Sequence, residues 1–480
     1  MKNHKVTTIS NNEIATSLSL NGYGILKSSL CTSDYEDLKK ALTVKPYINP
    51  EFAQLQPESN KIFSLFTEST SKIYIPKYYG LVNYGVSKDN KLNNGVESIY
   101  LDFKGSLRPE QNPAVTAIID ACKDPSKMGG ILNVFCGGGK TTMALYILAQ
   151  LQKKTLIVVH KDFLLNQWKE RIEQFLPTAR IGLIKAKVTN VIDCDIVLAS
   201  LQSLAMKEYP RDVFRSFGTL IVDEVHHTSA EVFSQALRKT VFPYTIGLSA
   251  TVTRKDGLSK VFKWFLGDIV YKSTKRTDTV NVIVKEYYHS SSAYSKEHVL
   301  NTRGTLNFAR MLNNICAFEP RTEYLLNQLY LVLDKEPQRK VLVLSDRRTH
   351  LLHMFEEVKA HGKHSTGVYI GGMKQDALTA CEDKQVIFAT YAIAAEGLDL
   401  RHMDTLLLAS PKGDIVQSVG RILRDKHLDR VPTIIDVVDC FSIFERQGQK
   451  RIKYYESQGY NVSGVVDKSK PVFEPNKCLF

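Results

Sequence analysis

The sequence predicts an α/β protein with two parallel β-sheets in tandem and an accessory domain at the amino terminus. The chain has 480 residues, too many for one hydrophobic core, so two or three domains are expected. Short apolar runs alternate with stretches of helical periodicity from about residue 130 to 272 and again from about residue 341 to 440. Strands this apolar, separated by helices, are typical of parallel sheets covered on both faces.

Each block contains a series of apolar runs of strand length. The runs of the first block are residues 131–135, 155–160, 179–184, 195–200, 219–224 and 245–249. Those of the second block are residues 341–345, 366–370, 385–390, 405–410 and 433–438. Because helical stretches separate the runs, each block is expected to form one sheet through repeated strand–helix units.

The remaining segments complete the predicted domain organisation. We expect an N-terminal accessory domain (1–95), a first sheet domain (96–272), a linker with a helical insertion (273–335), a second sheet domain (336–445) and a C-terminal extension (446–480). The accessory segment contains lysines but no arginine, since the first arginine of the chain is Arg108.

The charge of the chain bears on its partners. The formal net charge is +13, with a sequence pI near 9.1. A partner made of phosphates, such as a nucleic acid, would select a basic balance of this kind. The alternative is a generally basic, solubilising surface, so the charge alone supports nucleic acid only weakly.

The cysteines and the amino-terminal residues indicate the cellular compartment in which the protein is expected. The eight cysteines include no C-x-x-C pair, which argues against a zinc site and a disulfide framework and favours reduced thiols. The first residues are polar and lack the apolar core of a signal peptide. No apolar run is long enough to span a bilayer. The sequence therefore predicts an intracellular protein.

A glycine-rich turn follows the first predicted strand. Its sequence is Cys136-Gly137-Gly138-Gly139-Lys140-Thr141-Thr142, and a helical stretch follows. Glycines let backbone N–H groups close around phosphates, and the amino terminus of the helix adds a favourable dipole. In such a loop Lys140 reaches the β- and γ-phosphates of a nucleotide, and the Thr141 hydroxyl binds Mg²⁺. Val134 stands where the full pattern has its first glycine, so a purely structural turn is the alternative.

Two acids end the apolar run at residues 219–224. Asp223 would hold Mg²⁺, and Glu224 would orient and deprotonate an attacking water. His226 completes a D-E-x-H sequence. The alternative is an acidic strand end that faces solvent, which becomes less plausible downstream of a phosphate loop.

Together these residues resemble a known family, the superfamily 2 helicases of the DExH kind. The resemblance extends over roughly residues 105 to 430 and implies two RecA-like domains with ATP hydrolysed in the cleft between them. Leu107-Arg108-Pro109-Glu110-Gln111 resembles the adenine-recognition element. By that resemblance Gln111 reads the base edge and Arg108 stacks beside it.

Three later stretches match helicase motifs in the expected order. They are Ser249-Ala250-Thr251, the stretch from Thr390 to Asp399, and the Q-x-x-G-R-x-x-R sequence from Gln417 to Arg424. The resemblance assigns coupling to His226, Ser249, Thr251 and Gln417, nucleotide binding to Gly397 and Asp399, and charge stabilisation on the transferring phosphoryl group to Arg421 and Arg424. A solvated basic helix face is the alternative for the paired arginines.

The same resemblance implies a set of nucleic-acid contacts. The residues are Lys161, Gln167, Ser200, Gln202, Arg347 and Thr390. Such loops grip phosphates, so binding should be sensitive to salt and largely blind to sequence. Trp168, beside Gln167, is as compatible with core packing as with a nucleic-acid contact.

A nearer resemblance comes from the residues after Ser249-Ala250-Thr251. XPB-like DNA helicases carry an Arg-acid-Asp motif there, and in this chain Lys255 replaces the middle acid between Arg254 and Asp256. The motif set and the N-terminal extension also resemble helicases of large DNA viruses, such as the poxvirus transcript-release DNA helicase. That resemblance implies 3′→5′ DNA unwinding, a role in viral transcription with transcription-machinery partners, and packaging in the virion.

Two other functions are compatible with the same residues. A duplex translocase or branch-migration motor would hydrolyse ATP without separating strands. An ATP-gated scaffold would bind nucleic acid without turnover, although the intact Lys140, Asp223, Glu224 and Arg421 weigh against it.

Overall fold

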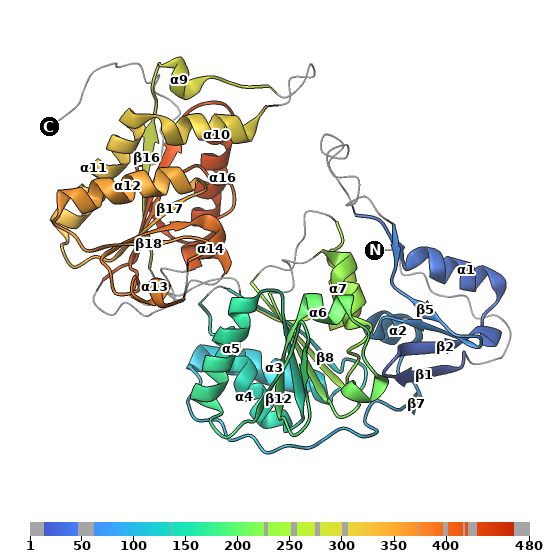
Figure 1. Cartoon of the computed structure of the whole chain (residues 1–480). Coiled ribbons are helices and arrows are strands. Elements are labelled where there is room, and N and C mark those ends of the chain that lie inside the picture. Colours follow the sequence, from blue (N-terminus) through green and yellow to red (C-terminus); the bar gives the residue numbers. More distant parts are fainter. Residues whose placement is uncertain are drawn as a thin grey trace. The chain divides into compact units, whose positions relative to one another are not determined.

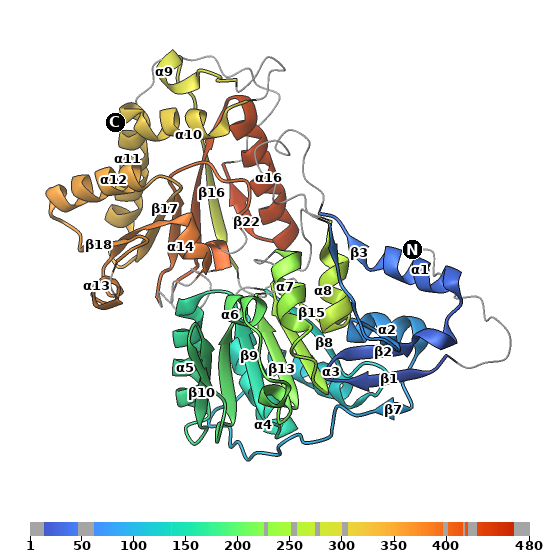
Figure 2. The same cartoon turned by 45° about the vertical axis from the view of Figure 1, so that its right-hand side comes forward.

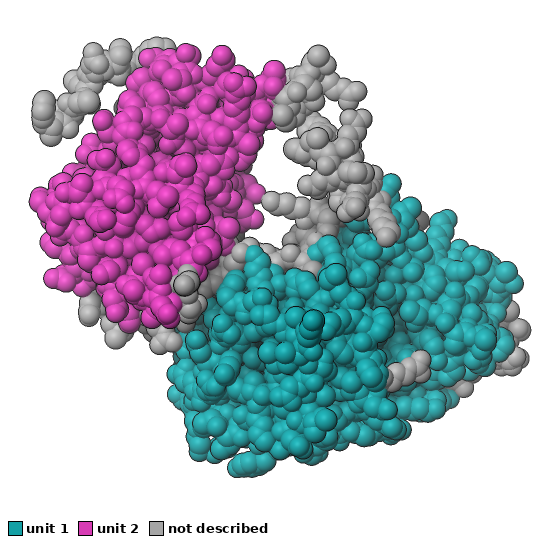
Figure 3. Space-filling view, viewed as in Figure 1, with its two compact units in different colours: residues 1–274 teal, residues 275–480 magenta. Residues whose placement is uncertain are grey.

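The chain forms two compact units, residues 1–274 and residues 275–480 (Figures 1 and 3). The computed structural model describes residues 14–46, 62–135, 137–224, 229–250, 257–273, 279–299, 306–373, 375–396, 402–415, 418–420 and 430–464. Each unit contains one large sheet of parallel strands, with a single antiparallel edge strand in the first unit, so the predicted α/β class is confirmed.

The first unit contains an eight-stranded sheet of order β11-β10-β12-β9-β13-β14-β8-β15. Its strands are β8 (Gly129–Val134), β9 (Thr155–Val159), β10 (Ile181–Lys185), β11 (Val188–Asn190), β12 (Ile196–Ser200), β13 (Thr219–Asp223), β14 (Tyr244–Ser249) and β15 (Ile269–Ser273). All six predicted strands are present. Two further strands, β11 and β15, lie at the two edges of the sheet, where a strand does not have to be apolar throughout.

Alternate residues along the strands bury into two cores, one on each face of this sheet. In β9, Ile157 and Val159 belong to one core, whereas Leu156 and Val158 belong to the other. The first core is covered by α3 (Asn112–Lys123), α4 (Lys140–Leu151) and α5 (Asp162–Phe175). The second is covered by α6 (Leu201–Met206), α7 (Ala230–Leu237) and α8 (Ser259–Leu266), as Figure 2 shows. Covering on both faces explains why the central strands are apolar throughout.

The N-terminal residues form a small sheet of order β5-β6-β2-β1-β7 that packs on the α8 side of the first unit. Its elements are β1 (Thr16–Ser19), β2 (Gly22–Leu26), β5 (Thr67–Glu68), β6 (Lys72–Ile75), β7 (Asp89–Asn90), α1 (Thr32–Ala41) and α2 (Lys77–Tyr84), with a two-stranded sheet of β3 (Thr43–Val44) and β4 (Phe63–Ser64). Apolar side chains of these strands and of α8 belong to one continuous core. The N-terminal segment is therefore packed onto the first sheet domain.

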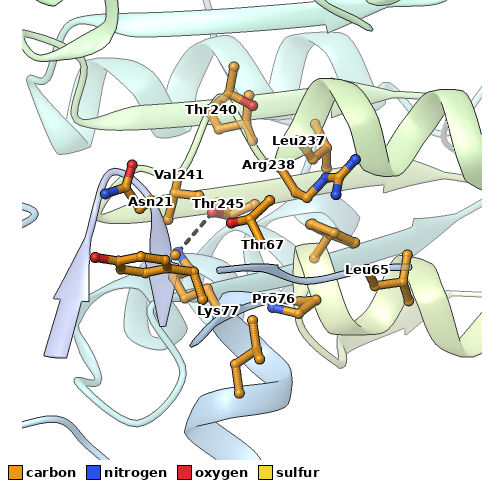
Figure 4. A pocket seen from close by; sticks show the side chains of 15 residues that line it. Asn21, Leu65, Thr67, Pro76, Lys77, Leu237, Arg238, Thr240, Val241 and Thr245 are labelled. Carbon is orange, nitrogen blue, oxygen red and sulfur yellow. Dashed lines mark hydrogen bonds between the residues drawn. The ribbon is translucent and has the colours of Figure 1, made fainter. Parts of the chain in front are cut away.

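A buried lysine, Lys77, holds the N-terminal segment against the first sheet domain. The ammonium group of Lys77 donates to the carbonyl oxygens of Phe242 (2.9 Å) and Pro243 (3.2 Å) and to the hydroxyl of Thr245 (2.9 Å). Figure 4 shows Lys77 beside Thr245 in a pocket between the small sheet and the first sheet domain. Burial lowers the pKa of Lys77 to about 7, and the three oxygens are the acceptors that an ammonium group needs.

Replacing this lysine should loosen the N-terminal segment. In Lys77→Met the three oxygens lose their donor, and each unsatisfied buried group costs about 1–3 kcal/mol. We expect the free energy of unfolding to fall by about 3 kcal/mol or more in denaturant titrations. The matched control is Lys91→Met, which removes a surface ion pair with Asp89 and should cost less than about 1 kcal/mol. Equal losses in both variants would contradict an anchoring role for Lys77.

The second unit contains a seven-stranded sheet of order β18-β19-β17-β20-β21-β16-β22, in which all pairs are parallel. Its strands are β16 (Asn281–Tyr287), β17 (Val341–Ser345), β18 (Thr366–Tyr369), β19 (Val386–Thr390), β20 (Thr405–Leu408), β21 (Thr433–Asp439) and β22 (Asn461–Ser463). Its helices are α9 (Ser292–Ser295), α10 (Phe308–Ala317), α11 (Glu319–Lys335), α12 (Arg348–His361), α13 (Gln375–Thr379), α14 (Tyr391–Glu396) and α16 (Ser442–Gln458). All five predicted strands are present.

This sheet draws on more of the chain than the predicted range 336–445. Strand β16 comes from the segment expected to be a linker, and β22 comes from the expected C-terminal extension. Polar stretches flank β16 on both sides, and β22 is short and largely exposed. Neither strand therefore stands out as an apolar run.

Two buried ion pairs attach helices to β21. Arg321 of α11 is fully buried and lies 2.6 Å from the carboxylate of Asp439, and it also donates to the Ala409 carbonyl oxygen at 2.7 Å. Arg451 of α16 pairs with Asp436 at 2.7 Å. Such pairs hold their helices in one orientation, because a displaced helix would leave a buried charge uncompensated. Within the described part of the chain, no helix combines the length and the apolar character needed to cross a membrane.

Candidate functional site

The candidate site lies at the carboxyl edge of the first sheet, where β13, β14 and β8 are neighbours. Asp223 at the end of β13 is in register with Leu248, and Ser249 at the end of β14 is in register with Asn133 of β8. The carboxyl ends of parallel strands share one edge, which is where ligands bind in open α/β sheets. The glycine-rich loop, the two acids and Ser249 therefore meet there.

The glycine-rich loop has a conformation that requires its glycines. Gly137 and Gly139 have positive φ angles of 82° and 81°, which residues with a side chain rarely adopt. A Cβ atom at Gly139 would lie 2.1 Å from the Gln111 amide nitrogen, and one at Gly138 would lie 2.4 Å from a methyl group of Val134. Val134, at the position where the full phosphate-loop pattern has a glycine, thus packs against the loop.

Lys140 begins α4 and faces the two acids. Its ammonium group lies 3.6 Å from the carboxylate of Glu224 and 3.4 Å from the carbonyl oxygen of Val134. Both side chains of this ion pair are largely buried, with exposed fractions of 11% and 22%. Thr141 and Thr142 follow in the first turn of α4 and are half-buried. The structure thus brings Lys140, Thr141 and Glu224 to one place.

The carboxyl group of Asp223 is partly buried at the end of β13. Burial and the neighbouring charge of Glu224 raise its pKa to about 6, and Lys140 and a hydrogen bond from Trp168 act in the opposite direction. The indole N–H of Trp168 donates to the Asp223 carboxylate at 2.9 Å. Glu224 itself has a φ of 49°, which is uncommon for a residue with a side chain and typical of strained functional positions.

The predicted adenine-recognition residues contact the phosphate loop. Gln111 is buried, with an exposed fraction of 4%. Its amide group donates to the Gly138 carbonyl oxygen at 3.0 Å, and its side-chain oxygen accepts from the Arg108 backbone at 2.9 Å. The guanidinium group of Arg108 donates to the Gly137 carbonyl oxygen at 3.4 Å. Both residues are therefore joined to the loop, and their contact with a base stays a prediction.

Four predicted nucleic-acid residues lie at the same edge of the first sheet. Lys161 caps α5 directly after β9, and Gln167 lies within α5. Ser200 ends β12, the neighbour of β9, and is in register with Val159. The side-chain amide of Gln202 donates to the His160 carbonyl oxygen at 2.9 Å. This contact joins the loops after β9 and β12 into one surface.

The two other described residues that are predicted to contact nucleic acid lie in the second unit. Arg347 follows β17, and Thr390 ends β19 in register with Ser345. The guanidinium group of Arg347 donates to Asn313 at 2.5 Å and to the Ala309 carbonyl oxygen at 3.2 Å, both on α10. The predicted residues that lie outside the described part of the chain are Cys136, His226, Thr251, Gly397, Asp399, Gln417, Arg421 and Arg424.

Comparisons with known proteins address the identity of the chain. The family described as "Type III restriction enzyme, res subunit" matches residues 104–254. A mimivirus protein, L396, is 33% identical over 460 residues, a match that covers 94% of this chain and 87% of the relative. The chain belongs to the superfamily 2 helicases and is close to those of large DNA viruses.

Two other viral helicases are also similar to this chain in sequence. The helicase 161L of invertebrate iridescent virus 6 is 27% identical, with 79% of this chain and 86% of the relative covered. The helicase QP509L of African swine fever virus is 23% identical, with 72% of each chain covered. This helicase is therefore an ATP-dependent enzyme that acts on nucleic acid.

Gly139 offers a test of the loop geometry in this helicase. In Gly139→Ala the new methyl group meets Gln111, and the left-handed backbone adds strain. We expect ATP binding to weaken at least tenfold, measured with a fluorescent nucleotide. Gly85→Ala is the matched control, since Gly85 has a φ of 78° but open space around a Cβ atom. Equal nucleotide affinity in the two variants would refute the role of the loop contact.

Substitutions of Lys140 and Glu224, which form an ion pair at the loop, should affect ATP binding and ATP turnover differently. Glu224→Gln keeps the shape of the side chain but removes the predicted base, so we expect ATP turnover to fall by about 10²–10⁴-fold while nucleotide binding persists. Lys140→Ala should lose turnover together with affinity for ATP. The exposed helix residue Glu170 gives the control Glu170→Gln, for which wild-type turnover is expected. Full activity in Glu224→Gln would overturn its assignment.

Proposed function

We propose that this helicase unwinds DNA in the 3′→5′ direction, driven by Mg²⁺-dependent ATP hydrolysis at the edge of the first sheet. The observation that carries the proposal is the convergence of Lys140, Asp223 and Glu224 beside a glycine-rich loop at the start of α4. The net charge of +13 supports a polyphosphate partner. The direction and the choice of DNA rest on the resemblance to XPB-like and large DNA virus helicases.

The residues at this edge fit ATP and Mg²⁺. Asp223 and Thr141 offer the hard oxygen ligands that Mg²⁺ prefers, and the partly buried negative charges of Asp223 and Glu224 outnumber the one positive charge of Lys140. The backbone N–H groups at the amino terminus of α4 would hold the phosphates. Bound Mg²⁺ would neutralise phosphate charge in the reaction.

The protein side chains would divide the hydrolysis between them. Lys140 binds the β- and γ-phosphates, and Glu224 orients a water molecule and accepts its proton. In the structure the ammonium group of Lys140 lies 3.6 Å from the Glu224 carboxylate. By the family resemblance, Arg421 and Arg424 stabilise charge on the transferring phosphoryl group, Gly397 and Asp399 contact the nucleotide, and His226, Ser249, Thr251 and Gln417 couple hydrolysis to nucleic-acid contact.

The nucleic acid would be held through its phosphates. On the first sheet the contacts come from Lys161, Gln167, Ser200 and Gln202, and on the second sheet from Arg347 and Thr390. Contacts of this kind release counterions, so the affinity should fall steeply with salt and depend little on sequence.

RNA is the second candidate substrate. The mimivirus and African swine fever virus relatives are both named for an ATP-dependent RNA helicase. We also propose a role in viral transcription, including transcript release, with transcription-machinery proteins as partners and the virion or viral factory as the location. Detection of the chain in purified particles would support that location, and its absence from them would exclude packaging.

Two measurements test the substrate and the direction. We expect ATPase activity to be stimulated most by single-stranded DNA when single-stranded DNA, duplex DNA and RNA are compared at one salt concentration. We also expect strand displacement from a duplex with a 3′ overhang and none from one with a 5′ overhang. Stimulation by RNA alone would favour the second candidate, and tracking of duplex DNA without displacement would favour a translocase. No stimulation by any nucleic acid would refute the motor.

A further inference from the structure

Trp168 occupies a position that core packing alone does not explain. It lies on α5 with an exposed fraction of 2%, among apolar side chains that include Leu165 and Ile172. Its indole N–H points to the end of β13 and donates to an oxygen of the Asp223 carboxylate at 2.9 Å. The side chain thus reaches from the apolar core to the acid that we assign to Mg²⁺.

The indole of Trp168 donates a hydrogen bond to Asp223, which an apolar side chain of similar size cannot do. A buried indole N–H needs an acceptor, and a carboxylate is a strong one. The bond engages Oδ2 of Asp223 and restricts rotation of the carboxyl group, so that Oδ1 has one preferred direction. Groups that hydrogen-bond to metal-binding carboxylates fix their orientation in this way.

Helix α5 connects this bond to the predicted nucleic-acid surface. The helix begins at Asp162, directly after Lys161, and Trp168 follows about two turns later. The residue before Lys161 is His160, whose carbonyl oxygen accepts the amide of Gln202. One helix therefore carries both the start of the predicted phosphate-gripping surface and the donor to Asp223.

We propose that Trp168 is a positioning residue: its indole N–H orients Asp223 for Mg²⁺, and α5 links that orientation to the nucleic-acid surface at Lys161. The proposal rests on the proposed function in one respect, the assignment of Mg²⁺ to Asp223. It adds a role for a buried side chain that acts through Asp223.

The first experiment measures the Mg²⁺ requirement. We expect Trp168→Phe to raise the Mg²⁺ concentration for half-maximal ATPase activity at least tenfold and to reduce the stimulation by nucleic acid. Trp264→Phe, the same substitution on α8, and Ile172→Val, which trims the same core without removing a hydrogen bond, should keep the wild-type Mg²⁺ midpoint. A wild-type midpoint in Trp168→Phe, or an equal shift in Ile172→Val, would overturn the proposal.

The second experiment reads Trp168 directly and needs no turnover. The chain has two tryptophans, so Trp264→Phe leaves Trp168 as the one fluorescent indole. With ATP bound, we expect the emission of Trp168 to change as Mg²⁺ is added and to reach a plateau, whereas the Trp264 emission of Trp168→Phe stays constant. An unchanged Trp168 emission would overturn the proposal even if Trp168→Phe failed to fold.

These results separate the proposal from the proposed function. If no nucleic acid stimulated the wild-type ATPase, the motor would fail, yet a Mg²⁺-dependent emission of Trp168 would still support its placement beside the metal ligand. If the wild-type ATPase were stimulated but the Mg²⁺ midpoint of Trp168→Phe were unchanged, the motor would stand and the positioning role would fail.

Discussion

The parallel pairing of β13, β14 and β8 is the constraint on which the candidate site depends. Their register sets Asp223 beside Leu248 and Ser249 beside Asn133, so that the loops after three separate strands begin at one edge. A slip of one residue would turn every side chain of a strand to the other face, and the separate cores on the two faces oppose that. The position of the acids relative to Lys140 therefore follows from the packing of apolar side chains far from the edge.

At that edge the protein concentrates charge in a partly buried space. Asp223 and Glu224 are adjacent in sequence, and the ammonium group of Lys140 lies 3.6 Å from the second of them. Burial of Asp223 and then the neighbouring charge of Glu224 raise the pKa of Asp223 to about 6, so the ionised carboxylate is costly to hold there. A divalent cation and a polyphosphate together would satisfy this arrangement, because the cation would offset the charge of the acids and the phosphates would accept from the ammonium group and the loop N–H groups.

The sequence predicted the parts of this protein that local pattern determines. All eleven apolar runs are strands, and the central ones are apolar throughout because they are buried on both faces. The strands β11, β15, β16 and β22 lack that signal because edge positions or polar flanks make it unnecessary. The acids, Lys140 and the glycines could be predicted because their spacing carries the chemistry. The bond from Trp168 to Asp223 could not, because its partners lie 55 residues apart and only the fold brings them together.

Gln111 and Trp168 both act on another part of the predicted site, a role that a motif does not reveal when each residue is taken alone. Each contacts a predicted part of the ATP site through one hydrogen bond, Gln111 through the Gly138 carbonyl oxygen and Trp168 through Asp223. A side-chain amide has two N–H groups, so Gln111 can keep the loop bond with one of them and meet an adenine edge with the other. The predicted base recognition and the loop shape would then depend on the same side chain. An indole has a single N–H, so Trp168 is committed to Asp223 and can act on nucleic acid only through its helix.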